Sequence, residues 1–268
     1  MEKENLKGRI DWVTTLIPFG IVLAMMLVFM LIPTQSKLFV DTLRGFFGDT
    51  IGIYYAILGL GCVLLALYLS FKDKYGQIRL GNIDKPLYGN FAWGTMIFTS
   101  TMAADIMFYS LIEWALYGAE PHVAELGKMQ LWAPTFPLFH WGPLAWGFYV
   151  VLAICFAFMM HVRKRERQRF SEAVRPLFGN KVDGSLGKLI DIVAIFAMVC
   201  ATATTFSLAT PLLASALASV FGISTSVTLT IGILLLICAV YTITVLLGMN
   251  GISKLASFCS YMFFAILF

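Results

Sequence analysis

Three aromatic side chains in one short run are of a type that could bind a cation. Trp141, Trp146 and Tyr149 lie within nine residues of each other. In a continuous helix at ~100° per residue, Trp146 would lie ~140° and Tyr149 ~80° from Trp141, so the rings would share one side. Aromatic faces attract quaternary ammonium groups, each ring contributing ~0.5–2 kcal/mol. The spacing indicates a pocket wall for such a cation; a membrane-interface aromatic belt is the alternative.

Asp105 is a second candidate, because it interrupts the apolar stretch 91–117. That stretch exceeds the ~20 residues that cross a bilayer. An ionisable group at mid-membrane costs ~2.5–3.5 kcal/mol on insertion scales, so it should face protein or a water-filled cavity. Met102, three residues earlier, would share its helix face. We interpret Asp105 as lining a site; the alternative is a buried carboxyl with a structural role. For Met102 the alternative to a substrate contact is plain packing.

Other kinds of chemistry have little support in the sequence. The three histidines (His122, His140 and His161) are too scattered for a metal site, and no Ser/His/Asp or phosphate-loop pattern occurs. The five cysteines lie singly in or beside apolar runs, without paired spacing. We therefore expect no enzyme activity, metal or cofactor, since an intramembrane enzyme would need a nucleophile or metal cluster at membrane depth.

The composition is that of an integral membrane protein. Hydrophobic residues make up 59% of the chain and charged residues 13%, with a mean hydropathy of +0.84; soluble domains have roughly a quarter charged residues. The net charge of +4 does not indicate nucleic-acid binding. The positions of Lys and Arg in short loops explain it better, because such residues set the orientation of a membrane protein. We expect no nucleic-acid partner.

The apolar runs predict an all-α polytopic protein with about seven transmembrane helices. The expected spans are residues 12–32, 51–71, 91–117, 141–160, 187–220, 227–247 and 252–268. Dense positive charge in 72–85 and 163–188 predicts that these loops and the N-terminus are cytoplasmic, and that 118–139 is an external loop. The 34 residues of 187–220 would be ~51 Å long as one helix, against a ~30 Å hydrocarbon core. We favour one long tilted helix.

Three stretches resemble one transporter family. His140-Trp141-Gly142-Pro143-Leu144-Ala145-Trp146-Gly147-Phe148-Tyr149 is similar to the aromatic-box helix of the betaine/choline/carnitine transporter (BCCT) family, and its opening to the carnitine-exchanger branch. Residues 187–191 with 207–211 resemble the family's long fifth helix, and 248–257 the glycine-containing turn into its seventh. The resemblance covers nearly the whole chain.

The resemblance implies a fold of twelve spans, in which two accessory helices precede two inverted five-helix repeats of LeuT-like type. Residues 1–89 then form an N-terminal segment with both accessory helices, and 90–268 form the first repeat. The second repeat is expected to be absent. The implied substrate-binding residues are Trp141, Trp146, Tyr149, Asp105 and Met102.

One part of the first repeat helix departs from the common family pattern. Residues 100–105 replace a glycine-rich stretch and are closer to the carnitine-type version, while choline-type members have an acid near the position of Asp105. Such a carboxylate suits a bare cation better than a zwitterion, whose own carboxylate it would repel. Glu113 is expected to make a helix-end polar contact, and Asp191 a favourable helix-dipole interaction.

The resemblance therefore implies a secondary active transporter of quaternary ammonium compounds (choline, glycine betaine, carnitine or related trimethylammonium solutes) in the plasma (inner) membrane, present as an N-terminal portion. Symport with Na⁺ or H⁺ and substrate exchange by an antiporter are both left open, and a homotrimer is the implied assembly. The alternative is a transport-inactive membrane fragment from a split or truncated reading frame.

Overall fold

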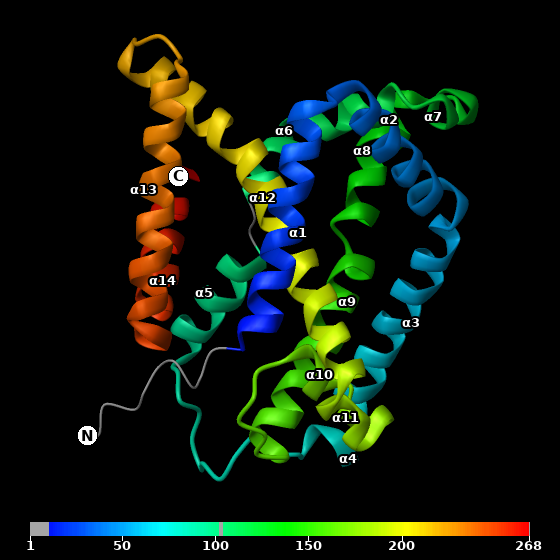
Figure 1. The fold of residues 1–268 in the computed structure, drawn as a ribbon, viewed down its shortest axis with the longest axis vertical. Coiled ribbons are helices and arrows are strands. Elements are labelled where there is room, and N and C mark those ends of the chain that lie inside the picture. Colours follow the sequence, from blue (N-terminus) through cyan, green and yellow to red (C-terminus); the bar gives the residue numbers. More distant parts are fainter. Residues whose placement is uncertain (1–10, 102–103, 268) are drawn as a thin grey trace. The chain divides into compact units, whose positions relative to one another are not determined.

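Every regular element in the described part of the chain is helical. The computed structural model describes residues 11–101 and 104–267. In chain order the helices are α1 (Trp12–Leu31), α2 (Pro33–Arg44), η2 (Gly45–Thr50), α3 (Gly52–Phe71), α4 (Asp73–Gly76), α5 (Asn90–Thr101), α6 (Ala104–Gly118), α7 (Pro121–Leu126), α8 (Met129–His140), α9 (Pro143–Ala157), η3 (Phe158–Val162), α10 (Phe170–Ala173), α11 (Arg175–Phe178), η4 (Gly179–Asp183), α12 (Ser185–Phe221), α13 (Val227–Leu246) and α14 (Gly248–Leu267) (Figure 1).

Five helices in the described residues are long and apolar enough to cross a membrane. They are Trp12–Leu31, Gly52–Phe71, Met129–Val162, Ser185–Phe221 and Val227–Leu246. The prediction of a helical membrane protein is therefore confirmed. The long run is one helix of 37 residues with Pro211 inside it, as predicted. It ends where Gly222 takes a φ of 65°, a left-handed conformation that a glycine adopts without strain.

Two connections between expected spans contain helices that the sequence analysis did not predict. The connection 33–49 forms α2 and most of η2, and the segment 118–139 contains α7 and most of α8. Pro33 and Pro121 stand in the first turns of α2 and α7. Proline is suited to that position, because its missing N–H would have no partner there and its φ is already helical. Pro33 and Pro121 therefore mark helix starts.

The chain divides into two compact units. The first comprises residues 1–83 and 135–200, and the second residues 84–134 and 201–268. In the first unit α3 lies along α9 (Figure 1), and glycines make the close approach possible. A Cβ added to Gly147 would lie 2.7 Å from Val63 Cγ2 and 3.3 Å from the Gly59 carbonyl oxygen. The missing side chain thus lets the α9 backbone rest on α3, as small residues do in membrane helix pairs.

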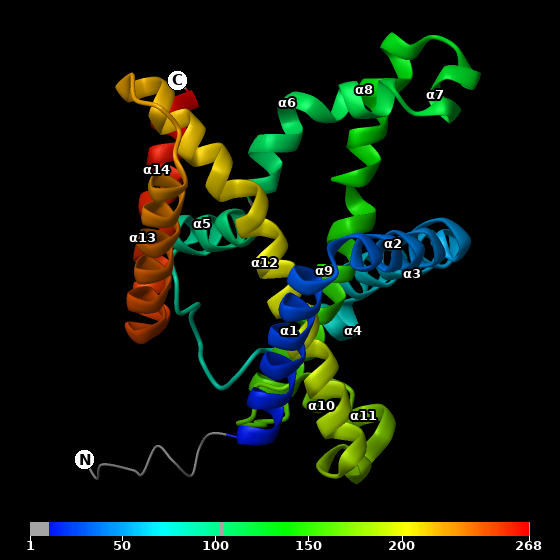
Figure 2. The same ribbon diagram turned by 45° about the horizontal axis from the view of Figure 1, so that its top comes forward.

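In the second unit α5 lies against α14, which also contacts α13 (Figure 2). The rings of Phe91 and Tyr261 stack with centroids 5.1 Å apart. Deeper in this contact the hydroxyl oxygens of Thr95 and Ser257 are 3.3 Å apart and share a hydrogen bond. The first half of the stretch 91–117 is therefore held to the last helix by aromatic packing and a polar pair. Its second half forms α6, and residues 102–103 lie outside the described chain.

Candidate functional site

The aromatic segment, residues 140–149, forms the junction between α8 and α9. The N–H of Trp141 donates to the Pro137 carbonyl at 2.9 Å, and α9 begins at Pro143. A Cβ on Gly142 would collide with the Leu138 carbonyl oxygen, so glycine is required at this bend. Trp141 therefore precedes α9 instead of lying on it. The estimate of ~100° per residue does not apply to Trp141.

A hydrogen bond and a ring contact bring the three predicted aromatic residues together. The indole N–H of Trp146 donates to the Trp141 carbonyl oxygen at 2.7 Å. The rings of Trp146 and Tyr149 meet edge to face, with centroids 6.4 Å apart and planes at 86°. The hydrogen bond crosses the bend and fixes the Trp146 ring against the backbone of Trp141. This satisfies the polar atom of Trp146, so its ring can act as an apolar surface.

His140 joins the segment, although the sequence did not predict it as a site residue. Its imidazole stacks on the Trp141 ring with centroids 5.0 Å apart and planes at 25°. Adjacency in sequence was the available signal, but neighbouring residues on a regular helix point ~100° apart. The bend at Gly142 removes that constraint. Trp141 and Trp146 are half-buried, while Tyr149 is 42% exposed, which leaves aromatic surface open within the first unit.

The other predicted site residues, Met102 and Asp105, lie on a different part of the chain. Met102 lies outside the described residues, and Asp105 is the second residue of α6, with a side chain that the described structure does not include. Asp105 belongs to the second unit and the aromatic segment to the first. Glu113, two turns further along α6, is buried. Within the first unit, the structure thus describes the aromatic part of the predicted site.

Comparison with known proteins identifies the family. The profile of the betaine/carnitine/choline family transporter (BCCT) matches residues 13–268. The chain belongs to the BCCT family. Among curated proteins it is similar to the glycine betaine transporter OpuD of Bacillus subtilis (strain 168), with 29% identity over 219 residues, covering 80% of this chain and 42% of the relative. The BCCT chain thus spans less than half the length of that relative, and it belongs to a family of transporters, not of enzymes.

At the other end of α9, the BCCT chain has a second organised region. We call residues 163–184 the connector, since they join η3 to α12. Asp191 in the first turns of α12 accepts two hydrogen bonds from Ser171, from its N–H and from its hydroxyl, both at 2.9 Å. Arg169 pairs with Asp11 at 3.1 Å and lies 3.9 Å from Asp191. Asp191 therefore anchors the connector, which the helix-dipole interpretation did not foresee.

A second set of ion pairs closes the connector on itself. The guanidinium of Arg175 donates to Glu172 at 2.7 and 2.8 Å and to Asp183 at 2.6 and 2.9 Å. Arg165 donates to Glu172 at 3.1 Å. The hydrogen bonds from Arg175 hold the pKa of Glu172 and that of Asp183 below their usual values, and the same bonds raise the pKa of Arg175. These groups are thus charged at neutral pH.

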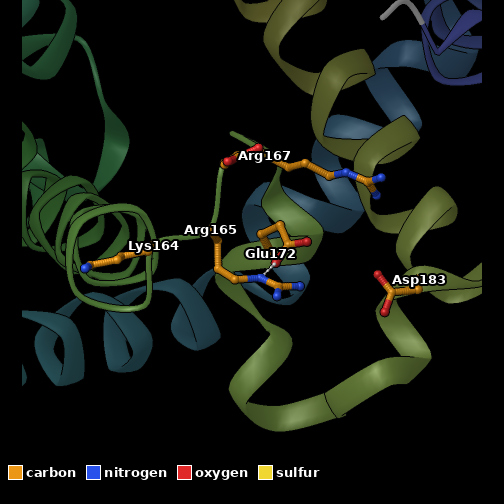
Figure 3. Close-up of a pocket in the computed structure, with 6 residues that line it drawn as sticks. Lys164, Arg165, Arg167, Glu172 and Asp183 are labelled. Carbon is orange, nitrogen blue, oxygen red and sulfur yellow. Dashed lines mark hydrogen bonds and ion pairs between the residues drawn. The ribbon is translucent and has the colours of Figure 1, made fainter. Parts of the chain in front are cut away.

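The ion pairs border a polar cavity of about 390 Å³. Its lining is made of charged residues alone, namely Lys164, Arg165, Glu166, Arg167, Glu172 and Asp183 (Figure 3). Just before α1, the pKa of Asp11 is lowered by the backbone N–H of Thr14 and then by the Arg169 guanidinium. The sequence showed the excess of positive charge here but not which acids would neutralise which cations, because most pairs are set by the turns between α10 and α12.

Proposed function

We propose that this chain forms the substrate-binding first half of a secondary active transporter for a quaternary ammonium solute, such as choline, glycine betaine, carnitine or a related trimethylammonium compound. The observation that supports this most is the geometry of the segment: the Trp146 indole donates to the Trp141 backbone carbonyl, and the Trp146 and Tyr149 rings meet edge to face. Membership of the BCCT family and similarity to a glycine betaine transporter agree with the same substrate class.

The chemistry of the substrate explains why aromatic rings would recognise it. A trimethylammonium head has no N–H to donate, so carbonyls and hydroxyls cannot select it. The negative faces of aromatic rings attract the delocalised positive charge, at ~0.5–2 kcal/mol per ring depending on desolvation. We propose that Asp105 supplies a countercharge to the ammonium group and that Met102 contacts the substrate.

The proposed architecture follows the family resemblance. Residues 90–268 form the first five-helix repeat of a LeuT-like fold, after two accessory helices in residues 1–89, giving seven spans with α5 and α6 as one interrupted span and α14 as the last. We propose a plasma-membrane protein with a cytoplasmic N-terminus, assembled as a homotrimer. The driving force is Na⁺ or H⁺ symport or substrate exchange.

Cysteine accessibility tests the proposed orientation. Ala124→Cys should react from the outside and Gln168→Cys from the cytoplasm, since both positions are exposed. Ser171 would be a poor site for a label, because it is only 4% exposed and bonded to Asp191. The reverse labelling pattern would contradict the proposed topology.

Substrate uptake tests the site in a protein that joins this chain to a second five-helix repeat. Asp105→Asn should weaken choline uptake more than betaine or carnitine uptake, because only choline lacks a carboxylate of its own. Trp146→Ala should weaken all three together, by ~0.5–2 kcal/mol, because each presents the same methylated head. An unchanged preference for choline over betaine in Asp105→Asn would remove Asp105 from the site.

The second candidate is a membrane fragment without transport activity. It is favoured by the match to 42% of the relative's length, since a midplane site between two repeats loses half its walls when one repeat is missing. Uptake of labelled choline, carnitine and betaine by residues 1–268 joined to a second five-helix repeat distinguishes the candidates, with residues 1–268 alone in liposomes as the control. We expect no uptake by these residues alone.

A further inference from the structure

The connector contains more positive charge than its own ion pairs use. Residues 163–184 include seven Lys or Arg residues and three acidic ones, an excess of four positive charges. The ion pairs described above involve Arg165, Arg169 and Arg175, and they use two of the three acids, Glu172 and Asp183, together with Asp11 from outside the connector. The ion pairs therefore involve two of the three acidic residues of the connector but only three of its seven cations.

The four remaining cations are exposed, and one of them, Arg163, lies over the Phe158 ring at 5.7 Å from its centroid. Lys164, Arg167 and Lys181 are exposed, and no ion pair of theirs occurs among the described residues. Figure 3 shows the Lys164 side chain extending away from Glu172. The connector thus has two sets of cations, one hydrogen-bonded within the network and one exposed without an ion pair among the described residues, and the exposed set is available to a partner.

Two large apolar side chains are exposed on the same connector. Leu177 is 80% exposed and Phe178 42% exposed, both at the end of α11. Exposed apolar side chains on α9 and α12 belong to candidate spans, whereas Leu177 and Phe178 lie outside them. It begins directly after Met129–Val162 and ends where Ser185–Phe221 starts. A segment joined at both ends to membrane-crossing helices lies at the level of the lipid headgroups.

We propose that the connector is a docking surface for anionic phospholipid headgroups, with Lys164, Arg167 and Lys181 binding the phosphates and Leu177 and Phe178 entering the headgroup boundary. Cations beside a span attract anionic lipid with ~1 kcal/mol each near the surface. Exposed Leu and Phe next to Lys and Arg are the composition of interfacial membrane contacts. An acidic protein segment would match the charges but not the apolar pair beside two span ends.

Lipid retention measured by native mass spectrometry tests this surface. The purified chain is equilibrated in micelles with equal amounts of phosphatidylglycerol and phosphatidylcholine. The wild type should retain phosphatidylglycerol preferentially, and Lys164→Gln/Arg167→Gln/Lys181→Gln should lower that retention at least tenfold, since each cation contributes about fivefold. Leu177→Ser should lower it less, by about two- to fivefold.

A matched control removes the same charge elsewhere. Lys72→Gln/Lys74→Gln/Lys85→Gln changes three exposed lysines in the other connection predicted to be cytoplasmic. It should keep most of the preference, whereas an equal loss in both triple variants would show that net charge alone decides and would overturn the proposal. Both variants should unfold at the wild-type temperature, because none of the six cations has an ion pair among the described residues.

Hydrogen exchange of the connector amides distinguishes lipid from a protein partner. In nanodiscs containing phosphatidylglycerol, exchange in residues 163–184 should slow severalfold relative to pure phosphatidylcholine, and 0.5 M salt should reverse the slowing, because exposed charges are screened. A soluble oligoglutamate peptide added to phosphatidylcholine nanodiscs should have little effect. Slowing by the peptide and none by phosphatidylglycerol would contradict the proposal.

Discussion

The two ends of α9 differ in how their polar groups are used. At its start, the aromatic segment uses one strong hydrogen bond, from Trp146 to the Trp141 carbonyl, and leaves aromatic surface exposed. At its far end, the connector directs Arg165 and Arg175 onto the nearly buried Glu172. One end keeps a recognition surface open, while the other uses its charges to hold its own fold.

The difference shows which region is expected to carry binding and which carries stability. A cation–aromatic contact needs rings that are fixed but still accessible, and the Trp146–Tyr149 contact provides both. A carboxylate shared by two guanidiniums at a buried position is already neutralised, so removing it exposes uncompensated charge. Substitutions of the paired connector residues Arg165, Glu172 and Arg175 should therefore change stability, and substitutions in the aromatic segment should change recognition.

The largest effect is expected at the connector acid. Glu172→Gln should lower the free energy of unfolding by ~3–5 kcal/mol, because it leaves Arg165 and Arg175 without their shared partner. Chemical denaturation in mixed micelles measures this loss. Glu166→Gln is the matched control, since Glu166 is exposed in the same connector and has no ion pair among the described residues; its effect should stay within ~0.5 kcal/mol. Equal losses would mean that the buried geometry does not matter.

The crossing of α3 and α9 supports both regions and should give the next largest effect. Gly147→Ala should destabilise the protein by ~1–3 kcal/mol, because the added Cβ would lie 2.7 Å from Val63 Cγ2 and 3.0 Å from its backbone nitrogen. Gly61→Ala on α3 meets no atom within 4 Å and should be neutral or slightly stabilising. Denaturation of the two variants compares them directly, and a stable Gly147→Ala would show that the helices separate easily.

Acid should weaken the connector before it affects the aromatic segment. Arg175 lowers the folded pKa of Glu172 below its ordinary value of 4.5, so the stabilisation is complete above that pH and is lost as the pH falls through the folded pKa. Between pH 5 and 3, the wild type should lose ~1 kcal/mol per pH unit more than Glu172→Gln does. Parallel pH profiles would show that Glu172 has an ordinary pKa in the folded protein.

The smallest effect on stability is expected in the aromatic segment. Trp146→Phe keeps a ring but removes the donor to the Trp141 carbonyl, so it should cost ~0.5–1.5 kcal/mol of unfolding free energy. Trp12→Phe at an exposed position should be near neutral and serves as control. A loss as large as that of Glu172→Gln would mean that the aromatic segment is itself structural, which would weaken the contrast between the two ends of α9.

The sequence alone determined the class of protein and most of the helices. Long apolar runs have one physical solution in a bilayer, because every backbone group must be bonded within a helix. The run 187–220 accordingly forms the single helix α12. Residue types also indicated the family, since residues 140–149 resemble a BCCT stretch, and membership of that family is confirmed by the match of the BCCT profile to residues 13–268.

Only the tertiary structure decided how these residues meet. The bend at Gly142 requires a glycine, because a Cβ there would collide with the Leu138 carbonyl oxygen, and a periodicity argument that assumed an unbroken helix misplaced Trp141. The partner of Asp191 is Ser171, twenty residues earlier, and no local rule selects that pair over a helix-dipole contact. The sequence shows that cations are abundant between residues 163 and 184. Which of them are neutralised depends on turns that bring Arg175 between Glu172 and Asp183, because an ion pair requires its two groups to lie within a few ångströms.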